Sequence, residues 1–184
     1  QRVFHLMCQD RGHAGHAALP HLTRDPMIAS AHLLLALQTI VSRDLDPLES
    51  AVLSLTTIQA GSVANQISDV AVLTGTMRTL RTSTRHAMEA AIRRIAAGTA
   101  TSFGVEIEVD VAHGIDVTRN TRVEADLAAE VAGAIGLKVR RDQPPAMTGE
   151  DFCWFLKQRP GAFVKPSPLI WPPFSNSLTR PWPG

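Results

Sequence analysis

The sequence predicts an α+β protein in which a four-stranded antiparallel sheet carries two helices on one face. Four stretches alternate apolar and polar residues as strands do, and two longer stretches repeat apolar residues at helical spacing. Glycine, proline or aspartate stands at most of the boundaries between them. Because the elements follow in the order β-α-β-β-α-β, the expected fold is ferredoxin-like, and a partial α/β segment follows it.

The first strand and the first helix are expected on either side of a turn rich in glycine and histidine. Residues 1–9, QRVFHLMCQ, mix apolar and polar β-formers. The helix is expected over 26–41, with Asp25 as N-cap and Pro26 at the first helical position, where a missing N–H does no harm. Apolar residues cover much of this helix, which implies burial against the sheet and allows a partner on the other side. They are Ile28, Leu34, Leu35, Ile40 and Val41.

Three further stretches predict the remaining strands. Residues 51–61, AVLSLTTIQAG, and residues 68–80, SDVAVLTGTMRTL, alternate apolar and polar positions as half-buried strands do. The connection between them holds Asn65. Residues 105–113, VEIEVDVAH, alternate in the same way and supply the fourth strand.

Two later helices are expected to end at glycines. The first starts after Thr82 or Ser83 as N-cap and ends at Gly104, which can adopt a left-handed conformation. The second repeats apolar residues every four positions from Val123 onward and ends at Gly136.

The character of the chain changes after the fourth strand, so we expect two parts, 1–115 and 116–184. The second part holds the helix that ends in glycine and two candidate short strands, 137–140 (LKVR) and 161–164 (GAFV). Thr148 is expected to cap one more helix, with the aspartate three residues later as a variant of the capping box.

The composition excludes several function classes. Of the 184 residues, 45% are hydrophobic, which is enough for a folded core. A formal net charge of +1, with both signs scattered, provides no basic stripe for nucleic acid, and the longest apolar run is too short to span a membrane. Cys8 and Cys153 have no metal or redox spacing, so we expect two unpaired thiols in a cytoplasmic compartment, although a single disulfide is also compatible.

The turn RGHAGHAALPHLTRDP places three histidines before a helix start. A metal site would need His13, His16 and His21 to converge, but no carboxylate or thiolate accompanies them. Alternatively, one histidine donates a hydrogen bond to an anion or to a developing oxyanion. Solvated loop histidines are a third interpretation, and the local pattern leaves all three open.

Five motifs occur in order along the chain: GHAGHAALPH, NQISD, GTMRTL, TGEDFCWFL and RPGAFV. In this order and at these separations they resemble the M20 metallopeptidase family, and within it the amidohydrolases that cleave N-acyl amino acids, such as hippurate hydrolase. The resemblance extends to about Val164. It implies that residues 1–115 are the lid, or dimerisation, domain of such an enzyme, and that 116–184 are a truncated part of its catalytic domain.

The resemblance implies a role for each matching residue. His16 would reach into the active site of the neighbouring subunit and stabilise the tetrahedral oxyanion. Asn65 would hydrogen-bond the substrate, although a turn-forming role explains it nearly as well. Arg78 would bind the substrate carboxylate through its bidentate fork, and His21 would have a supporting role.

The chain departs from the family at the metal centre. The resemblance implies a pair of divalent ions (Zn, Mn or Co) held mainly by the half of the catalytic domain that precedes the lid, and no such half is in this sequence. A histidine ligand expected after PGAF is also missing, because residues 165–184 hold no histidine. We therefore expect no metal site or cofactor in this chain. The abrupt loss of resemblance suggests a shifted reading frame, which the coding DNA around Lys165 would test.

The function expected from these observations is that of a fragment of a metal-dependent amidohydrolase. It would supply lid residues that contact an N-acyl amino acid, form a homodimer through the lid, and be inactive by itself. The chain begins inside a strand without an initiator methionine, so it is expected to be cut from a longer one. The alternative is a non-catalytic module for homodimerisation or small-ligand binding, which would use the sheet edge and the apolar helix.

Overall fold

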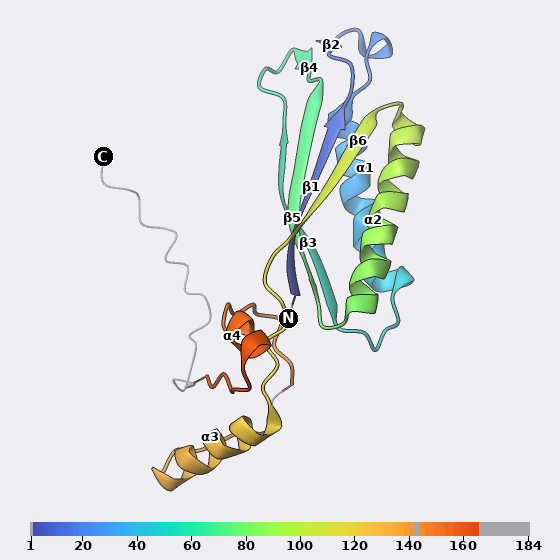
Figure 1. Ribbon diagram of the computed structural model, residues 1–184. Helices are drawn as coiled ribbons and strands as arrows, with labels where there is room; N and C mark the ends of the chain where they lie inside the picture. The colour runs from blue at the N-terminus through green and yellow to red at the C-terminus, as the bar shows by residue number, and fades with distance from the viewer. Residues whose placement is uncertain (1, 142–143, 166–184) are drawn as a thin grey trace, which may run out of the picture.

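Four antiparallel strands form the main sheet in the order β3-β5-β1-β6 (Figure 1). The computed structural model describes residues 2–141 and 144–165. The strands are β1 (Arg2–Arg11), β3 (Ala51–Ala60), β5 (Val70–Thr79) and β6 (Glu106–His113), and the helices that pack on them are α1 (Pro26–Thr39) and α2 (Thr82–Phe103). Both helices cover the same face of the sheet, so the ferredoxin-like arrangement is confirmed.

Alternation along the strands decides which side chains meet the helices. In β5, every second residue from Ala71 to Thr79 is buried, and the residues between them are half-buried on the open face. Cys8 of β1 lies opposite Leu73 of β5 and Val109 of β6, so these three share one layer of the core. The largest buried apolar side chains of the core are Leu33, Leu37, Ile40, Leu73, Met77, Met88 and Ile92.

Helix α1 begins as the sequence predicts and ends slightly earlier. Asp25 Oδ1 accepts a hydrogen bond from the N–H of Met27 at 2.8 Å, and Pro26 occupies the first turn, so the predicted cap is confirmed. The regular helix ends at Thr39. A wider π-helical turn, η2 (Ile40–Asp44), then leads to the loop before β3.

The apolar residues of α1 divide between two sides. Leu33 and Leu37, together with Ile40 directly after the helix, are buried against the sheet and α2. In contrast, the Leu35 side chain is 67% exposed and that of Ile28 is 50% exposed. The helix therefore has a packed face and a second apolar surface in solvent, as the wide apolar coverage in the sequence indicated.

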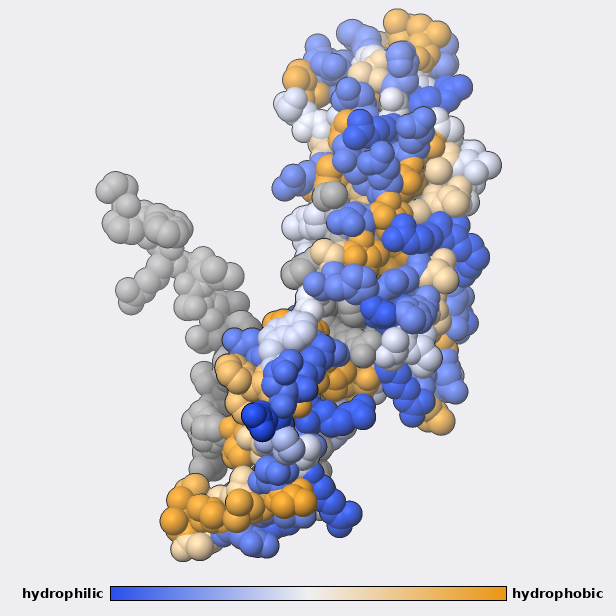
Figure 2. Space-filling model, viewed as in Figure 1, coloured by the Kyte–Doolittle hydropathy of each residue, from blue (hydrophilic) through white to orange (hydrophobic). Residues whose placement is uncertain are grey.

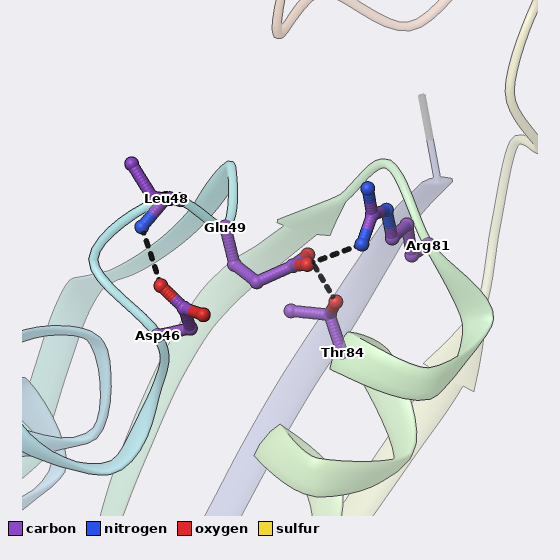
Figure 3. Close-up of polar contacts among 5 residues, drawn as sticks. All are labelled: Asp46, Leu48, Glu49, Arg81 and Thr84. Carbon is purple, nitrogen blue, oxygen red and sulfur yellow. Dashed lines mark hydrogen bonds and ion pairs between the residues drawn. The ribbon is translucent and has the colours of Figure 1, made fainter.

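A carboxylate from the loop before β3 stabilises the N-terminus of α2 (Figure 3). Arg81 occupies the N-cap position and makes no side-chain cap bond, so the predicted caps, Thr82 and Ser83, are wrong. Instead, Glu49 accepts hydrogen bonds from Arg81 Nη1 at 2.6 Å and from Thr84 Oγ1 at 2.7 Å. This negative charge also interacts favourably with the positive end of the helix dipole, which explains why no local cap is needed.

Beyond β6, the described chain forms two further helices, α3 (Arg122–Ala134) and α4 (Cys153–Gln158). Gly104 and Gly136 follow α2 and α3 with φ of 64° and 83°. Both helices therefore end near the predicted glycines, and the left-handed conformation predicted for Gly104 is confirmed. No residue of α3 is buried. Figure 2 shows apolar side chains along this helix, at the lower end of the molecule in the view of Figure 1.

Three predictions for this segment are wrong. Residues 137–140 and 161–164 are not strands, because within the described chain they have no neighbouring strand with which to pair. Asn120 takes the place of a strand partner, since its side chain accepts from the N–H of Phe163 at 2.8 Å and donates to its carbonyl at 3.0 Å. Thr148 does not cap α4, which begins five residues later.

Several other expectations have simpler outcomes. Cys8 and Cys153 are both buried free thiols, which confirms the unpaired alternative. Within the described ranges, no helix has the length and apolar character needed to cross a bilayer. Residues 166–184, which hold six of the 12 prolines of the sequence, lie outside the described residues. The division into 1–115 and 116–184 stays a prediction.

Candidate functional site

Two short strands fold the histidine-rich segment against the loop before β5. β2 (Gly15–His16) pairs with β4 (Gln66–Ile67) at the end of the main sheet where β1 stops and β5 begins (Figure 1). The backbone passes so close to Arg24 that a Cβ at Gly12 would lie 2.0 Å from the Arg24 carbonyl oxygen. Glycine at this position therefore serves close backbone packing, which holds the turn in place.

His16 is exposed, and its ring is oriented by its own backbone turn. The N–H of Ala18 donates to His16 Nδ1 at 3.1 Å, and the N–H of Leu19 donates to the His16 carbonyl at 2.8 Å. Because Nδ1 accepts, the neutral imidazole carries its proton on Nε2. The ring is therefore arranged as a hydrogen-bond donor toward solvent or toward a ligand.

The structure places Asn65 directly beside His16. The N–H of Ala17 donates to the Asn65 carbonyl at 3.0 Å, and His16 pairs with Gln66 in the β2–β4 register. The Asn65 side chain is exposed, so its amide is accessible to a ligand. Two of the predicted site residues thus lie at one end of the sheet, although 49 positions separate them in the sequence.

The other two histidines of the turn occupy different local structures. His13 forms an isolated β-bridge with Arg24, and His21 is exposed in a 3-10 turn, η1 (Pro20–Leu22). Among the residues that the structure describes, no three His, Cys, Asp or Glu side chains come together to hold a metal ion. This donor set does not fit a metal centre, so the metal interpretation of the turn, which needed His13, His16 and His21 to converge, is not supported.

Arg78 lies near the opposite end of β5, on the open face of the sheet. Its Nη1 donates to the Met147 carbonyl at 2.7 Å. The eight residue steps from Val70 to Arg78 correspond to about 27 Å of strand, and His16 lies beyond the Val70 end. The Arg78 and His16 side chains of one chain therefore cannot contact the same small ligand.

Asp10 is a buried carboxyl that the sequence pattern did not identify. Ser30 Oγ donates to its Oδ2, whereas its Oδ1 has no hydrogen-bond partner among the described residues. Burial raises the pKa of Asp10, and the Ser30 bond opposes this effect. The pKa of the Cys8 thiol is also raised, to about 12. Burial is the larger cause, and the nearby negative charge of Asp10 is the smaller one. The available signal was spacing, since Asp10 follows Cys8 by two positions, and extending the predicted strand, residues 1–9, by one residue would have placed both on the core side.

Comparison with known proteins identifies the family. A family model described as a peptidase dimerisation domain matches residues 6–102, which extend from β1 almost to the end of α2. The chain belongs to the M20 family. The resemblance in the sequence motifs is thereby confirmed, and the ferredoxin-like part of the chain is an M20 dimerisation domain.

Relatives of this M20 chain include two proteins named N-acetyldiaminopimelate deacetylase. The one from Streptococcus suis is 36% identical over 152 residues, which cover 82% of this chain and 40% of the relative. The one from Shouchella clausii is 38% identical over 161 residues, covering 85% and 42%. The chain therefore spans about two fifths of the length of these curated relatives.

Solved structures agree with the fold. The YXEP protein of Bacillus subtilis, described as a dinuclear metal binding peptidase from the M20 family, matches with a TM-score of 0.64 at 28% identity, covering 87% of this chain and 39% of that chain. A hydantoinase/carbamoylase family amidase from Burkholderia ambifaria has a TM-score of 0.70 at 22% identity, covering 87% and 39%, and shows the fold alone. The roles of His16, Asn65, Arg78 and His21 stay predictions.

Proposed function

We propose that this chain supplies the substrate-contacting lid of an M20 amidohydrolase that hydrolyses the amide bond of an N-acyl amino acid. The deacetylase names of its relatives support this reaction class. The single observation that carries the proposal is the separation of His16 and Asn65 from Arg78 along the sheet. Residues separated in this way can all contact substrate only if the two ends of the domain contribute to different active sites, as in a dimer.

Each residue has a role that its local structure permits. His16 Nε2–H would stabilise the oxyanion that forms when water adds to the acyl carbonyl, and Asn65 would orient the same substrate. Arg78 would bind the substrate carboxylate, while His21 would support the turn. A pair of divalent ions would be held by residues outside this chain, and the free thiols of the two cysteines suit a cytoplasmic compartment.

The two edges of the sheet differ in a way that favours one dimer contact. The ten residues of β3 include no charged side chain. On the opposite edge, β6 exposes Glu106, Glu108 and Asp110, which would face like charges across a two-fold axis. The exposed apolar side of α1, a helix that also contacts β3, would extend a β3 contact. We therefore place the homodimer interface at β3 and α1.

These same surfaces favour a second candidate function, a non-catalytic homodimerisation or ligand-binding module. A dimer that forms at micromolar concentration but supports hydrolysis in no assembly would favour this candidate. The measurement that separates the two is therefore activity in a complete M20 scaffold.

The test transplants the matched region of this chain into the Streptococcus suis relative in place of its own 152 matched residues. We expect the chimera to release acetate from N-acetyldiaminopimelate in the presence of Mn(II) or Zn(II), and the 184-residue chain alone to be inactive. In the chimera, His16→Ala should lower kcat by about 100- to 1000-fold, the usual effect of removing one oxyanion donor.

His21→Ala, in the same turn, is the matched control and should change kcat much less. Equal activity of the His16→Ala chimera and its parent would exclude the oxyanion role. Metal-dependent hydrolysis by the isolated chain would contradict the proposed division of the active site between this chain and missing residues.

A further inference from the structure

Arg78 connects the sheet to a turn that lies 69 residues later in the chain. The hydrogen bond from its Nη1 to the Met147 carbonyl is 2.7 Å long, and its donor belongs to a positively charged guanidinium group. Val52, its neighbour in register on β3, is apolar, so this neighbour does not pair with the charge. The guanidinium is therefore directed to the segment that follows the dimerisation domain.

The acceptor belongs to a turn, residues 147–152, that contains the TGEDF motif. From its own segment, the turn is held by Thr118 Oγ1, which donates to the Glu150 carbonyl at 3.2 Å, and by Lys165 Nζ, 2.8 Å from Glu150 Oε1. Phe152 packs against Phe155, with ring centroids 5.6 Å apart. The dimerisation domain adds the bond from Arg78, so the 147–152 turn is held from both parts of the chain.

The guanidinium has donors left for a second partner. Arginine carries five N–H donors in a planar fork, and the bond to Met147 uses one of them, on Nη1. The edge formed by Nε and Nη2 makes no hydrogen bond to the described residues and matches the two oxygens of a carboxylate. Arg78 can therefore bind a ligand carboxylate while it keeps its bond to the turn.

We propose that Arg78 is a positioning residue for the 147–152 turn, in addition to its proposed contact with the substrate carboxylate. A carboxylate on the Nε/Nη2 edge fixes the plane of the guanidinium, which strengthens the bond to Met147 and holds the turn against the sheet. Carboxylate binding and turn placement are thus coupled through one side chain. The coupling to carboxylate binding rests on the proposed function, whereas the positioning of the turn by the Arg78–Met147 hydrogen bond does not.

The two native thiols make the proposal testable without catalysis. Cys153, directly after the turn, is 1% exposed, and Cys8 lies in the core of the dimerisation domain. In the 184-residue chain, maleimide labelling of each thiol is followed by mass spectrometry, together with amide exchange of the 147–152 turn. In Arg78→Met, we expect labelling of Cys153 and amide exchange of the turn to be about tenfold faster, which corresponds to a decrease of about 1.4 kcal/mol in the free energy of opening. The labelling rate of Cys8 should not change.

Two variants separate positioning from general destabilisation. Arg78→Lys keeps one charged donor and should restore part of the protection. Arg81→Met removes an exposed arginine that pairs with Glu49 and should leave Cys153 labelling at the wild-type rate. Unchanged Cys153 labelling and turn exchange in Arg78→Met would overturn the proposal, and so would equal acceleration at Cys8, because that result means global unfolding.

A ligand comparison tests the coupling. Millimolar N-acetyl-L-alanine should slow Cys153 labelling in the wild-type chain but not in Arg78→Met, and its methyl ester should have no effect. Equal effects of acid and ester, or no effect of either, would overturn the coupling. Because no turnover is measured, these results are distinct from failure of the hydrolysis experiment with the chimera.

Discussion

At the residue scale, Asp10 makes the stability of the dimerisation domain depend on pH. Its side chain is fully buried, and one carboxylate oxygen has no partner among the described residues. Burial favours the protonated carboxyl, so the pKa of Asp10 is higher in the folded chain than in the unfolded chain. Its contribution to stability is therefore complete below the unfolded pKa, near 3.8, and is lost as the pH rises through the folded pKa.

We expect Asp10→Asn to remove this pH dependence, because the amide cannot ionise and can still accept from Ser30. In the wild-type chain, the contribution of Asp10 to the free energy of unfolding should fall by about 1–3 kcal/mol as the pH rises through the folded pKa, since an unsatisfied buried group costs about this much. The measurement is urea unfolding at several pH values. The exposed Asp69, changed to Asn, is the control and should keep the wild-type slope; the same slope in Asp10→Asn would contradict this account.

Single residues also show what sequence can predict. Asp25 and Gly104 act within one turn of their own position, so local spacing was sufficient to predict both. The predicted caps at Thr82 and Ser83 were wrong because Glu49, from a loop far away in sequence, supplies the negative charge instead. A local pattern cannot predict a partner that only the folded chain brings near.

At the element scale, α3 has helical periodicity but no buried side chain. Its 13 residues include no buried side chain, and its apolar side chains Val123, Leu127 and Val131 are 75%, 59% and 55% exposed. Helices of about 12–15 residues or fewer are marginal in water without tertiary packing. This element thus depends on surface that the described chain does not provide.

We therefore expect amides of α3 to exchange with solvent close to the rate of an unstructured peptide. Those of α2, which has six buried residues, should be protected by several orders of magnitude and serve as the internal reference. Hydrogen exchange with mass spectrometry measures both in one sample. Comparable protection of the two helices would show that α3 is stable by itself.

The edge strand β3 provides the second prediction at this scale. Thr56→Lys combined with Ile58→Lys places charges on an edge strand that has none, and both positions are exposed. If β3 pairs with its copy, like charges meet across the interface and the dimer should dissociate at concentrations where the wild-type chain is dimeric. Sedimentation measures the mass.

The control for this edge is Ala112→Lys, which adds one positive charge, of the same sign but half the size, at an exposed position on β6. This variant should keep the wild-type mass. Dissociation by the β6 variant, with no effect of the β3 variant, would place the interface on the opposite edge of the sheet.

At the scale of the whole molecule, the sequence predicted the sheet and its two helices because their periodicities are local and consistent. The candidate site could be predicted only as separate motifs. His16 and Asn65 meet through the β2–β4 pair, and Arg78 meets Met147 from 69 positions away. The spacing of residues within a motif does not indicate such long-range contacts. The strands predicted at 137–140 and 161–164 were wrong for the same reason, because a strand forms only beside a partner strand.

The unequal edges of the sheet also determine how far association can proceed. A sheet with two neutral edges could add copies at both ends and grow into a fibre. Here a pair formed through β3 presents only the acidic β6 strands at its two outer edges, and these repel further copies. If the chain pairs through β3 as proposed, the same distribution of charge would stop assembly at two chains and so prevent polymerisation.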